Sequence, residues 1–371
     1  MPIYMDIHDT TGVSVEDVAA DHQRDFTLQD DFNCKFVFFW HDIPNNTGFC
    51  VFEAPQKESV INLHNASHGH SPNQIIEIEL SQVESFLGKI ADIAWSKKNL
   101  PFEGYISKTA HRAIMSLEIN NPLSLKLQIN KSKLAEIENL QKKLIKDSLL
   151  KLDGNKVSWE NENILISFLS EENAINCAAD IQHKFSNLAT EANSRTSVSI
   201  GLNFGAPVTK SDDLFGDVIS LAIKLGYIAG QNRVLISSSL GKAYNYLKIK
   251  TGLKNGFIKV VNSRSEKFIN KLFDMLEKNW NQEVFTIDSL VKQFGMSRAQ
   301  LYRRIVDLTG HSPNNFIREV RLKNALKMIE EQKGSISEIA YGSGFNNPSY
   351  FSRCFFKKYG IQPSEYAHKI V

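Results

Sequence analysis

The last hundred residues of this 371-residue chain contain a helix-turn-helix pattern that occurs twice. In the first copy, "FTIDSLVKQFGMSRAQLYRRIVDLTGHSP", a short helix is predicted over Ile287 to Phe294 and should end at Gly295. After a three-residue turn, Ser297 can cap a second helix that runs to about Thr309. The apolar residues of the two helices can form a small shared core.

The second copy, "SISEIAYGSGFNNPSYFSRCFFKKYGIQPSEY", has the same layout. Its short helix should reach Tyr341, its turn should lie at Gly342–Gly344, and its second helix should run from about Pro348 to Lys358. The segment between the copies, "PNNFIREVRLKNALKMIEEQ", has the pattern of one long amphipathic helix that can hold the two units rigidly.

Each second helix carries polar residues opposite its apolar stripe. A DNA major groove accepts an α-helix, and Arg, Gln and Asn side chains can read base edges there. Two such helices on a rigid connector could enter two successive grooves, whereas one basic helical segment alone could equally be a plain solvated bundle. The candidate DNA-contacting residues are Ser297, Arg298, Gln300, Arg303, Arg304, Asn347, Ser349, Tyr350, Arg353 and Lys357.

The sequence "GFNNPSYFSRCFFKKYGIQPSEY" resembles the signature of the AraC/XylS family of transcription regulators, and the first unit with its connecting helix is similar too. The resemblance covers residues ~266–371. Val291 and Ile305 depart from the commonest family residues but stay apolar. The resemblance implies double-stranded promoter DNA and RNA polymerase as partners. It assigns base readout to Arg298, Gln300, Arg303, Asn347, Ser349 and Arg353.

Charge is distributed unevenly along the chain. Residues 1–100 hold 6 Lys and Arg against 15 Asp and Glu, whereas residues 264–371 hold 17 against 11. A polyanionic partner is therefore expected at the C-terminal end. Four scattered cysteines, no secretory signal pattern and no apolar run long enough for a membrane favour a cytoplasmic protein without a membrane partner.

Residues 1–80 alternate as β-α-β-β-α-β, which is the order of a ferredoxin-like fold. The strands are "IYMDIHD", "CKFVFFWHD", "GFCVFEAP" and "QIIEIEL", and "IPNNT" supplies the hairpin turn. A helix and the linker "SKKNLPFEG" follow over residues 81–104.

Six of the ten histidines lie in residues 1–70. His64 and His68 are four residues apart on the second predicted helix, a spacing that can hold a transition metal, although such a pair on an exposed helix can also simply be solvated. His22 can converge with His64 because both helices should cover one sheet face. Imidazoles suit nickel, copper or zinc, so His22, His41, His64 and His68 are the candidate ligands.

This region also resembles a small family of ferredoxin-like proteins with a nickel-binding member. The shared landmarks are the M-D-x-H start, the H-Q-R-D helix, the F-C-x-x-E-A-P strand and the histidine-rich second helix. The resemblance implies a metal sensor that responds to nickel or another divalent transition metal. A small-molecule effector, such as an apolar ligand in a ferredoxin-like dimer, is the competing interpretation. No nucleophile stands beside a base, so a catalytic cluster is not favoured.

Residues 105–250 form a second α/β pattern, which includes "NILISFLSEENAINCAADIQHKF", "SVSIGLNFGAPV" and "DLFGDVISLAIKLGYIAGQNRVLISSSL". These stretches resemble the class III nucleotidyl cyclase domain. Cyclase chemistry needs two metal-binding aspartates. Here those positions fall on Glu118 and on Glu162 in "NEN", while the phosphate-binding Asn and Arg fall on Ser220 and Lys224. A degenerate domain that dimerises or binds a nucleotide is therefore expected, and no enzymatic activity.

The sequence thus predicts a multidomain α+β protein, in which a ferredoxin-like sensing domain (1–80) and a linker (81–104) precede a cyclase-like α/β domain (105–250). An all-α double helix-turn-helix domain (266–371) follows. The predicted function is sequence-specific transcription regulation by a homodimer. The alternatives are a divergent nucleotidyl cyclase with a DNA-binding tail and a metal-binding or storage protein.

Overall fold

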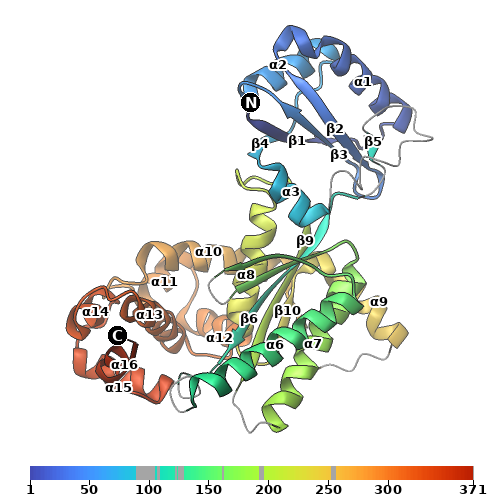
Figure 1. Ribbon diagram of the computed structural model, residues 1–371. Coiled ribbons are helices and arrows are strands. Elements are labelled where there is room, and N and C mark those ends of the chain that lie inside the picture. The colour runs from blue at the N-terminus through green and yellow to red at the C-terminus, as the bar shows by residue number, and fades with distance from the viewer. Residues whose placement is uncertain are drawn as a thin grey trace.

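The computed structural model describes residues 1–88, 105–106, 109–121, 123, 129–160, 163–191, 196–251 and 256–370. Two sheets and a helical C-terminal region follow one another along the chain (Figure 1). The predicted linker "SKKNLPFEG" lies outside the described residues. Among the described helices, none combines the length and apolar character needed to cross a membrane.

The N-terminal region is a sheet with two helices on one face. Its elements are β1 (Ile3–Asp9), α1 (Val15–Leu28), β2 (Lys35–Asp42), β3 (Thr47–Glu53), α2 (Lys57–Ser67) and β4 (Gln74–Ile78). The strand order β4-β1-β3-β2, with antiparallel neighbours, is the ferredoxin-like arrangement that the sequence predicted.

One additional strand differs from the sequence prediction. β5 (Tyr105–Ile106) pairs in parallel with β2 and so belongs to the first sheet, although we expected residue 105 to begin the middle domain. A strand of two residues has no periodicity, so its sequence gives no indication of which sheet it joins.

The two faces of the first sheet have different neighbours. Val18 of α1 and Val60 and Leu63 of α2 pack on Phe39 and Phe52. The opposite face packs against α3 (Leu80–Leu87) and against residues of the middle region. This sheet is therefore covered on both sides by its own chain.

The middle region is a sheet of order β11-β10-β9-β6-β8-β7. Its strands are β6 (Arg112–Asn120), β7 (Asn155–Glu160), β8 (Asn163–Phe168), β9 (Ser197–Gly205), β10 (Arg233–Ile236) and β11 (Ile258–Val260). The helices α6 (Lys131–Lys151), α7 (Glu171–Glu191) and α9 (Gly241–Thr251) cover one face, and α8 (Gly216–Ala229) covers the other (Figure 1).

Helix α8 belongs to two hydrophobic cores. Val218 and Ala222 pack in the core beneath the first sheet. Leu221, Leu225 and Ile228 pack in a second core with the C-terminal helices. One helix thus contacts both ends of the protein.

The C-terminal region is entirely helical. It comprises α10 (Ser263–Asn279), α11 (Ile287–Phe294), α12 (Arg298–Thr309), α13 (Pro313–Glu330), α14 (Ile336–Gly342), α15 (Pro348–Tyr359) and α16 (Pro363–Ile370). Gly295 ends α11 with a φ of 60°, and Ser297 and Gln300 form a capping box at the start of α12. The helix-turn-helix pairs are α11/α12 and α14/α15, joined by α13 as the sequence predicted.

Candidate metal centre and DNA-binding face

The histidine-rich stretch folds back onto the first sheet. His64 lies near the end of α2 with a fully buried side chain, and its Nε2 is 2.9 Å from Asp6 Oδ2 on β1. Its Nδ1 is 3.0 Å from His68 Nε2, one helical turn later, and 3.3 Å from Asp25 Oδ2 on α1. His64 thus joins two helices and a strand.

Asp25 is the second junction of the cluster. Its carboxylate has a fully buried side chain and lies 3.3 Å from His22 Nδ1 and 3.4 Å from His68 Nε2. It also accepts a hydrogen bond from Ser67. Three groups of potential ligands have donor atoms within 4.8 Å of one another. They are Asp6, His8, Cys50 and His64; Asp25, His64 and His68; and Asp21, His68 and His70.

The charges in the cluster stabilise one another. Burial by itself lowers the pKa of His64, but its hydrogen bonds to Asp25 and Asp6 outweigh burial and raise that pKa to about 10. Burial raises the pKa of Asp25, yet the hydrogen bonds from His22, His64 and His68 bring it well below its usual range. His22 differs, because desolvation dominates there and lowers its pKa.

The structure brings three of the four predicted ligands together. His22, His64 and His68 all contact Asp25. Of the four, His64 and His68 belong to the ligand groups found among the described residues, and His22 and His41 belong to none of them. His41 pairs with Gly48 on β3, and Gly48 pairs with His8 on β1. His41 is therefore one strand farther from the cluster than His8.

The sequence interpretation did not include Asp6, Asp25 or His8 among the candidate ligands. Asp6 and His8 alternate with Tyr4 on β1, so a period of two places all three on the helix-covered face. Asp25 follows His22 by three residues on α1, a spacing that puts them on one helix face. Phe26, the apolar residue after Asp25 on α1, is 49% exposed.

The donor set fits a transition metal. Two nitrogens bound at right angles to one ion at ~2.1 Å lie roughly 3 Å apart, which is close to the separation of His64 Nδ1 and His68 Nε2. His8 Nε2 is buried and lies 3.4 Å from Asp6 Oδ1, so it also faces this donor set. Imidazole nitrogen and carboxylate oxygen are donors suited to nickel or zinc.

On α12, most candidate DNA residues already contact protein. The Arg298 side chain donates to both carboxylate oxygens of Asp288, Gln300 Oε1 accepts from the Ser297 amide at 3.0 Å, and both side chains remain exposed. Arg304 turns away, because its guanidinium lies 4.4 Å from the Phe268 ring centre and donates to the Arg264 carbonyl.

Arg303 is exposed on α12, and among the described residues its guanidinium donates one long, 3.4 Å hydrogen bond to the Ala299 carbonyl. Tyr302, which our interpretation did not select, is 49% exposed beside it. Its position next to Arg303 on the second helix of the unit is the sequence feature that could have added Tyr302 to the candidate DNA-contacting residues.

On α15, the predicted residues form an exposed row. Asn347 caps the helix, since its Oδ1 accepts a 2.9 Å hydrogen bond from the Tyr350 amide. Arg353 lies over the Tyr350 ring at 5.9 Å from its centre. Ser349 and Lys357 are exposed along the same helix. The second unit therefore presents more of its candidate side chains to solvent without an ion pair or capping hydrogen bond among the described residues than the first unit does.

Two positions aligned with cyclase chemistry have other partners here. Glu118 pairs with Lys323 of α13, and Lys224 Nζ donates to Asn270 Oδ1 of α10 at 3.1 Å. Glu162 lies outside the described residues, and Ser220 is half-buried. Both charged side chains thus attach the middle region to the C-terminal helices.

The geometry defines a multidomain protein in which a double helix-turn-helix domain is joined to a ferredoxin-like domain through an α/β domain. A family described as "Helix-turn-helix domain" matches residues 290–369, and one described as "Nickel responsive protein SCO4226-like" matches residues 4–78. These matches confirm the two resemblances seen in the sequence, AraC-type at the C-terminus and nickel-responsive at the N-terminus.

Two curated relatives share part of the chain. "Histidine kinase P4" of Formosa agariphila is 38% identical over 109 residues, which are 29% of this chain and 8% of that protein. "HTH-type transcriptional activator RhaS" of Mannheimia succiniciproducens is 38% identical over 90 residues, 24% of this chain and 33% of that protein. The chain thus spans a third or less of the length of either relative.

Two solved structures are also similar to part of the chain. SCO4226 of Streptomyces coelicolor A3(2) is 30% identical, with a TM-score of 0.20, and the match covers 20% of this chain and 94% of that one. An adenylate/guanylate cyclase/hydrolase of Silicibacter pomeroyi is 22% identical, with a TM-score of 0.32, covering 37% of this chain and 80% of that one.

Proposed function

We propose that this protein is a sequence-specific DNA-binding transcription regulator whose N-terminal domain holds a divalent transition metal, nickel first among them. The cyclase-like α/β domain joins sensor to reader and carries no enzymatic activity in this proposal. The regulator acts in the cytoplasm, as a homodimer that works with RNA polymerase. The proposed division of the chain is the one stated from the sequence, with β5 assigned to the first domain.

One observation carries the DNA-binding part. Two second helices, α12 and α15, expose polar residues on one rigid connector, α13, whose residues pack into the cores of both units. Such helices fit the major groove, and base edges are read there by bidentate side chains. Lys and Arg of the basic C-terminal region would neutralise phosphates, so affinity should fall with salt.

Arg303→Ala and Arg353→Ala are each expected to weaken binding to a specific site by ~1–3 kcal/mol and to relax its base preference. Both guanidinium groups are exposed and make no ion pair among the described residues. Fluorescence anisotropy at fixed salt on the protein's own upstream DNA measures the effect.

Arg298→Ala provides a comparison on the same helix. It should cost less than Arg303→Ala because the Arg298 guanidinium is already paired with Asp288. Lys143→Ala on α6, an exposed charge outside the C-terminal region, should leave binding unchanged. Unaltered binding by both Arg303→Ala and Arg353→Ala would contradict the assignment of the reading helices.

The metal part depends on the buried cluster. His64, His68 and Asp25 would hold the ion, with His8, Asp6 and His22 beside them. A bound ion supplies positive charge between α1, α2 and β1. Because Asp25 and His68 come from different helices, holding the same ion fixes the position of α2 against α1. A metal-dependent change in the packing of α2 against α1 is therefore the structural change by which metal binding would affect the rest of the chain.

His68→Ala is the cleaner test of the metal site, because His68 has fewer buried partners than His64. Loss of a residue that only supports a metal ligand typically lowers metal affinity by roughly 10–100-fold. Because His68 is proposed as a ligand itself, the variant should lose at least this much nickel affinity. Equilibrium titration with nickel after chelator treatment measures it. His183→Ala, an exposed histidine on α7, is the matched control and should bind as the parent does.

Fluorescence anisotropy of DNA binding, measured with and without nickel, then distinguishes a metal sensor from a metal-storage protein. A sensor shows a nickel-dependent change in DNA affinity that His68→Ala removes. A metal store binds nickel without any change in DNA affinity. Cyclic nucleotide formed from ATP or GTP with manganese would instead support the divergent cyclase.

A further inference from the structure

The two ring nitrogens of His64 face different ligand groups. Nδ1 lies 3.0 Å from His68 Nε2 and 3.3 Å from Asp25 Oδ2, and these three residues, here called the helix-side group, would hold the ion of the proposed function. Nε2 lies 2.9 Å from Asp6 Oδ2 on β1. Because the two nitrogens of an imidazole point to different sides of the ring, one ion cannot bind both. The Nε2 side is therefore not used by that ion.

The Nε2 side of His64 has a donor set of its own, here called the strand-side group. Its members are Asp6, His8, Cys50 and His64, with one donor atom of each within 4.8 Å of the others. Asp6 connects them, since its Oδ1 lies 3.4 Å from His8 Nε2 and accepts a 2.8 Å hydrogen bond from the Cys50 amide. Cys50 Sγ also lies 3.7 Å from the ring nitrogens of His22. The side chains of Asp6, Cys50 and His64 are fully buried.

We propose that the strand-side group is a second metal site, which holds a divalent ion of the zinc type. Its four donors can complete a tetrahedral coordination shell, as in sites that hold zinc permanently. A thiolate among them favours zinc over ions such as magnesium or manganese, which prefer oxygen donors. The helix-side group has three donors and leaves a position open, which suits an exchangeable ion. The inference rests on the proposed metal-binding function and adds a second, permanently held ion to it.

The charges of the two filled sites would balance. With a metal ion on each nitrogen, the His64 ring is an imidazolate with one negative charge. Two divalent ions bring four positive charges, and the imidazolate, the Cys50 thiolate and the carboxylates of Asp6 and Asp25 bring four negative ones. Balance is needed because a net charge buried away from water is costly. The protons displaced from the thiol and the ring leave to solvent as the ions bind.

The ligand groups also provide a route from the surface to the buried site. A third group consists of Asp21, His68 and His70, and the His70 side chain is 72% exposed. This outer group shares His68 with the helix-side group, which in turn shares His64 with the strand-side group. Asp21 is also paired with Arg24, whose positive charge weakens cation binding in the outer group. An ion taken up there can therefore be released inward.

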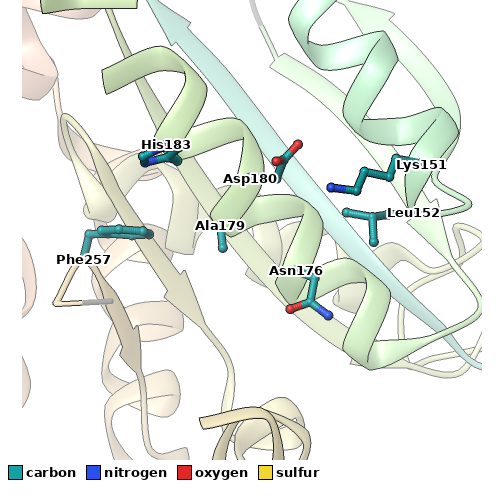
Figure 2. A pocket seen from close by; sticks show the side chains of 7 residues that line it. All are labelled: Lys151, Leu152, Asn176, Ala179, Asp180, His183 and Phe257. Carbon is teal, nitrogen blue, oxygen red and sulfur yellow. The ribbon is translucent and has the colours of Figure 1, made fainter. Parts of the chain in front are cut away.

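A hollow of about 410 Å³ beside α7 is also lined by a histidine and a carboxylate, but these do not converge (Figure 2). Asp180 and Lys151 lie on one side of the helix, while His183 and Phe257 lie on the other. Neither Asp180 nor His183 belongs to a ligand group among the described residues. His183→Ala therefore serves as a control for histidine loss away from the proposed sites.

Titration of the chelator-treated full chain with cobalt(II) tests the second site. Tetrahedral cobalt(II) bound to a thiolate absorbs in the visible and has a sulfur-to-metal charge-transfer band in the near ultraviolet. Two equivalents should bind, and one of them should produce this band. Cys50→Ser should remove the band and weaken the binding of that equivalent about tenfold or more, since a ligand is lost. Zinc should displace the cobalt that produces the band.

Cys34→Ser is the matched control, because Cys34 is a buried cysteine of the same domain that belongs to no ligand group among the described residues. It should keep the band and both equivalents, as should His183→Ala. His68→Ala should weaken the other equivalent and keep the band. His8→Ala repeats the test at a partly exposed side chain, where loss of the imidazole should not prevent folding, and it should weaken the equivalent that produces the band.

The outcomes separate the second site from the proposed function. A single equivalent without the charge-transfer band would overturn the second site and leave the one ion of the proposed function in place. A band that persists in Cys50→Ser, or that disappears in Cys34→Ser, would also contradict the second site. Absence of any bound ion would overturn the proposed metal-binding function together with this inference.

Discussion

Gly201→Ala should abolish the stable fold of the middle region. Gly201 lies on β9 directly beneath α8, and a Cβ at this position would overlap the Ala222 carbonyl oxygen and the Gly226 amide nitrogen. Both obstacles are backbone, so no side-chain rotation can relieve the overlap. We expect a loss of about 4 kcal/mol or more in the free energy of unfolding, at the upper end for single substitutions.

Urea denaturation followed by circular dichroism measures this loss. Gly241→Ala is the matched control, because its Cβ would stand 3.5 Å from Val260 Cγ1, an ordinary contact, and its φ of −61° suits alanine. This control should unfold at the parent's urea concentration or slightly above. A Gly201→Ala variant as stable as the control would show that α8 packs farther from β9.

His64→Ala should destabilise the N-terminal domain by about 3–5 kcal/mol in the absence of metal. Its imidazole lies between the carboxylates of Asp6 and Asp25, and all three side chains are fully buried. Removing the imidazole leaves two buried carboxylates without the cation that they share. Thermal unfolding of chelator-treated protein measures the loss.

The pH dependence gives a second measurement on the same group. The pKa of His64 is raised from 6.5 to about 10 in the folded protein. The stability contributed by its charge is therefore fully present below pH 6.5 and is lost as the pH rises through 10. His64→Ala should lack this alkaline loss, and a parent protein whose stability is flat over this range would argue against a charged His64.

The helical C-terminal region could be predicted closely because its signals are local. Gly295, Ser297 and Gly360 mark helix ends by backbone geometry and capping, which depend only on adjacent residues. The order of β1 to β4 in the first sheet was equally accessible, since it follows from the alternation of strands and helices, whereas the place of β5 was not.

The candidate metal centre was only partly accessible. Spacing identified His64 and His68, but it could not show that Asp6 would contact His64 from a strand 58 residues away. The involvement of Arg304 with Phe268 was hidden for the same reason, because α10 packs on α12 through a tertiary contact. Patterns of period two or 3.6 give the face of each element but not the partner it meets.

The two cores that share α8 determine how this protein can be divided. A fragment beginning at α10 would lose the helix that covers Phe268, Leu272 and Phe316. Such a fragment would expose this apolar surface to water and should self-associate when expressed alone. A fusion of the double helix-turn-helix domain to another sensing domain would therefore have to include α8, or carry polar substitutions on the apolar surface that α8 covers. The smallest unit suited to such a fusion is the double helix-turn-helix domain together with the α/β domain.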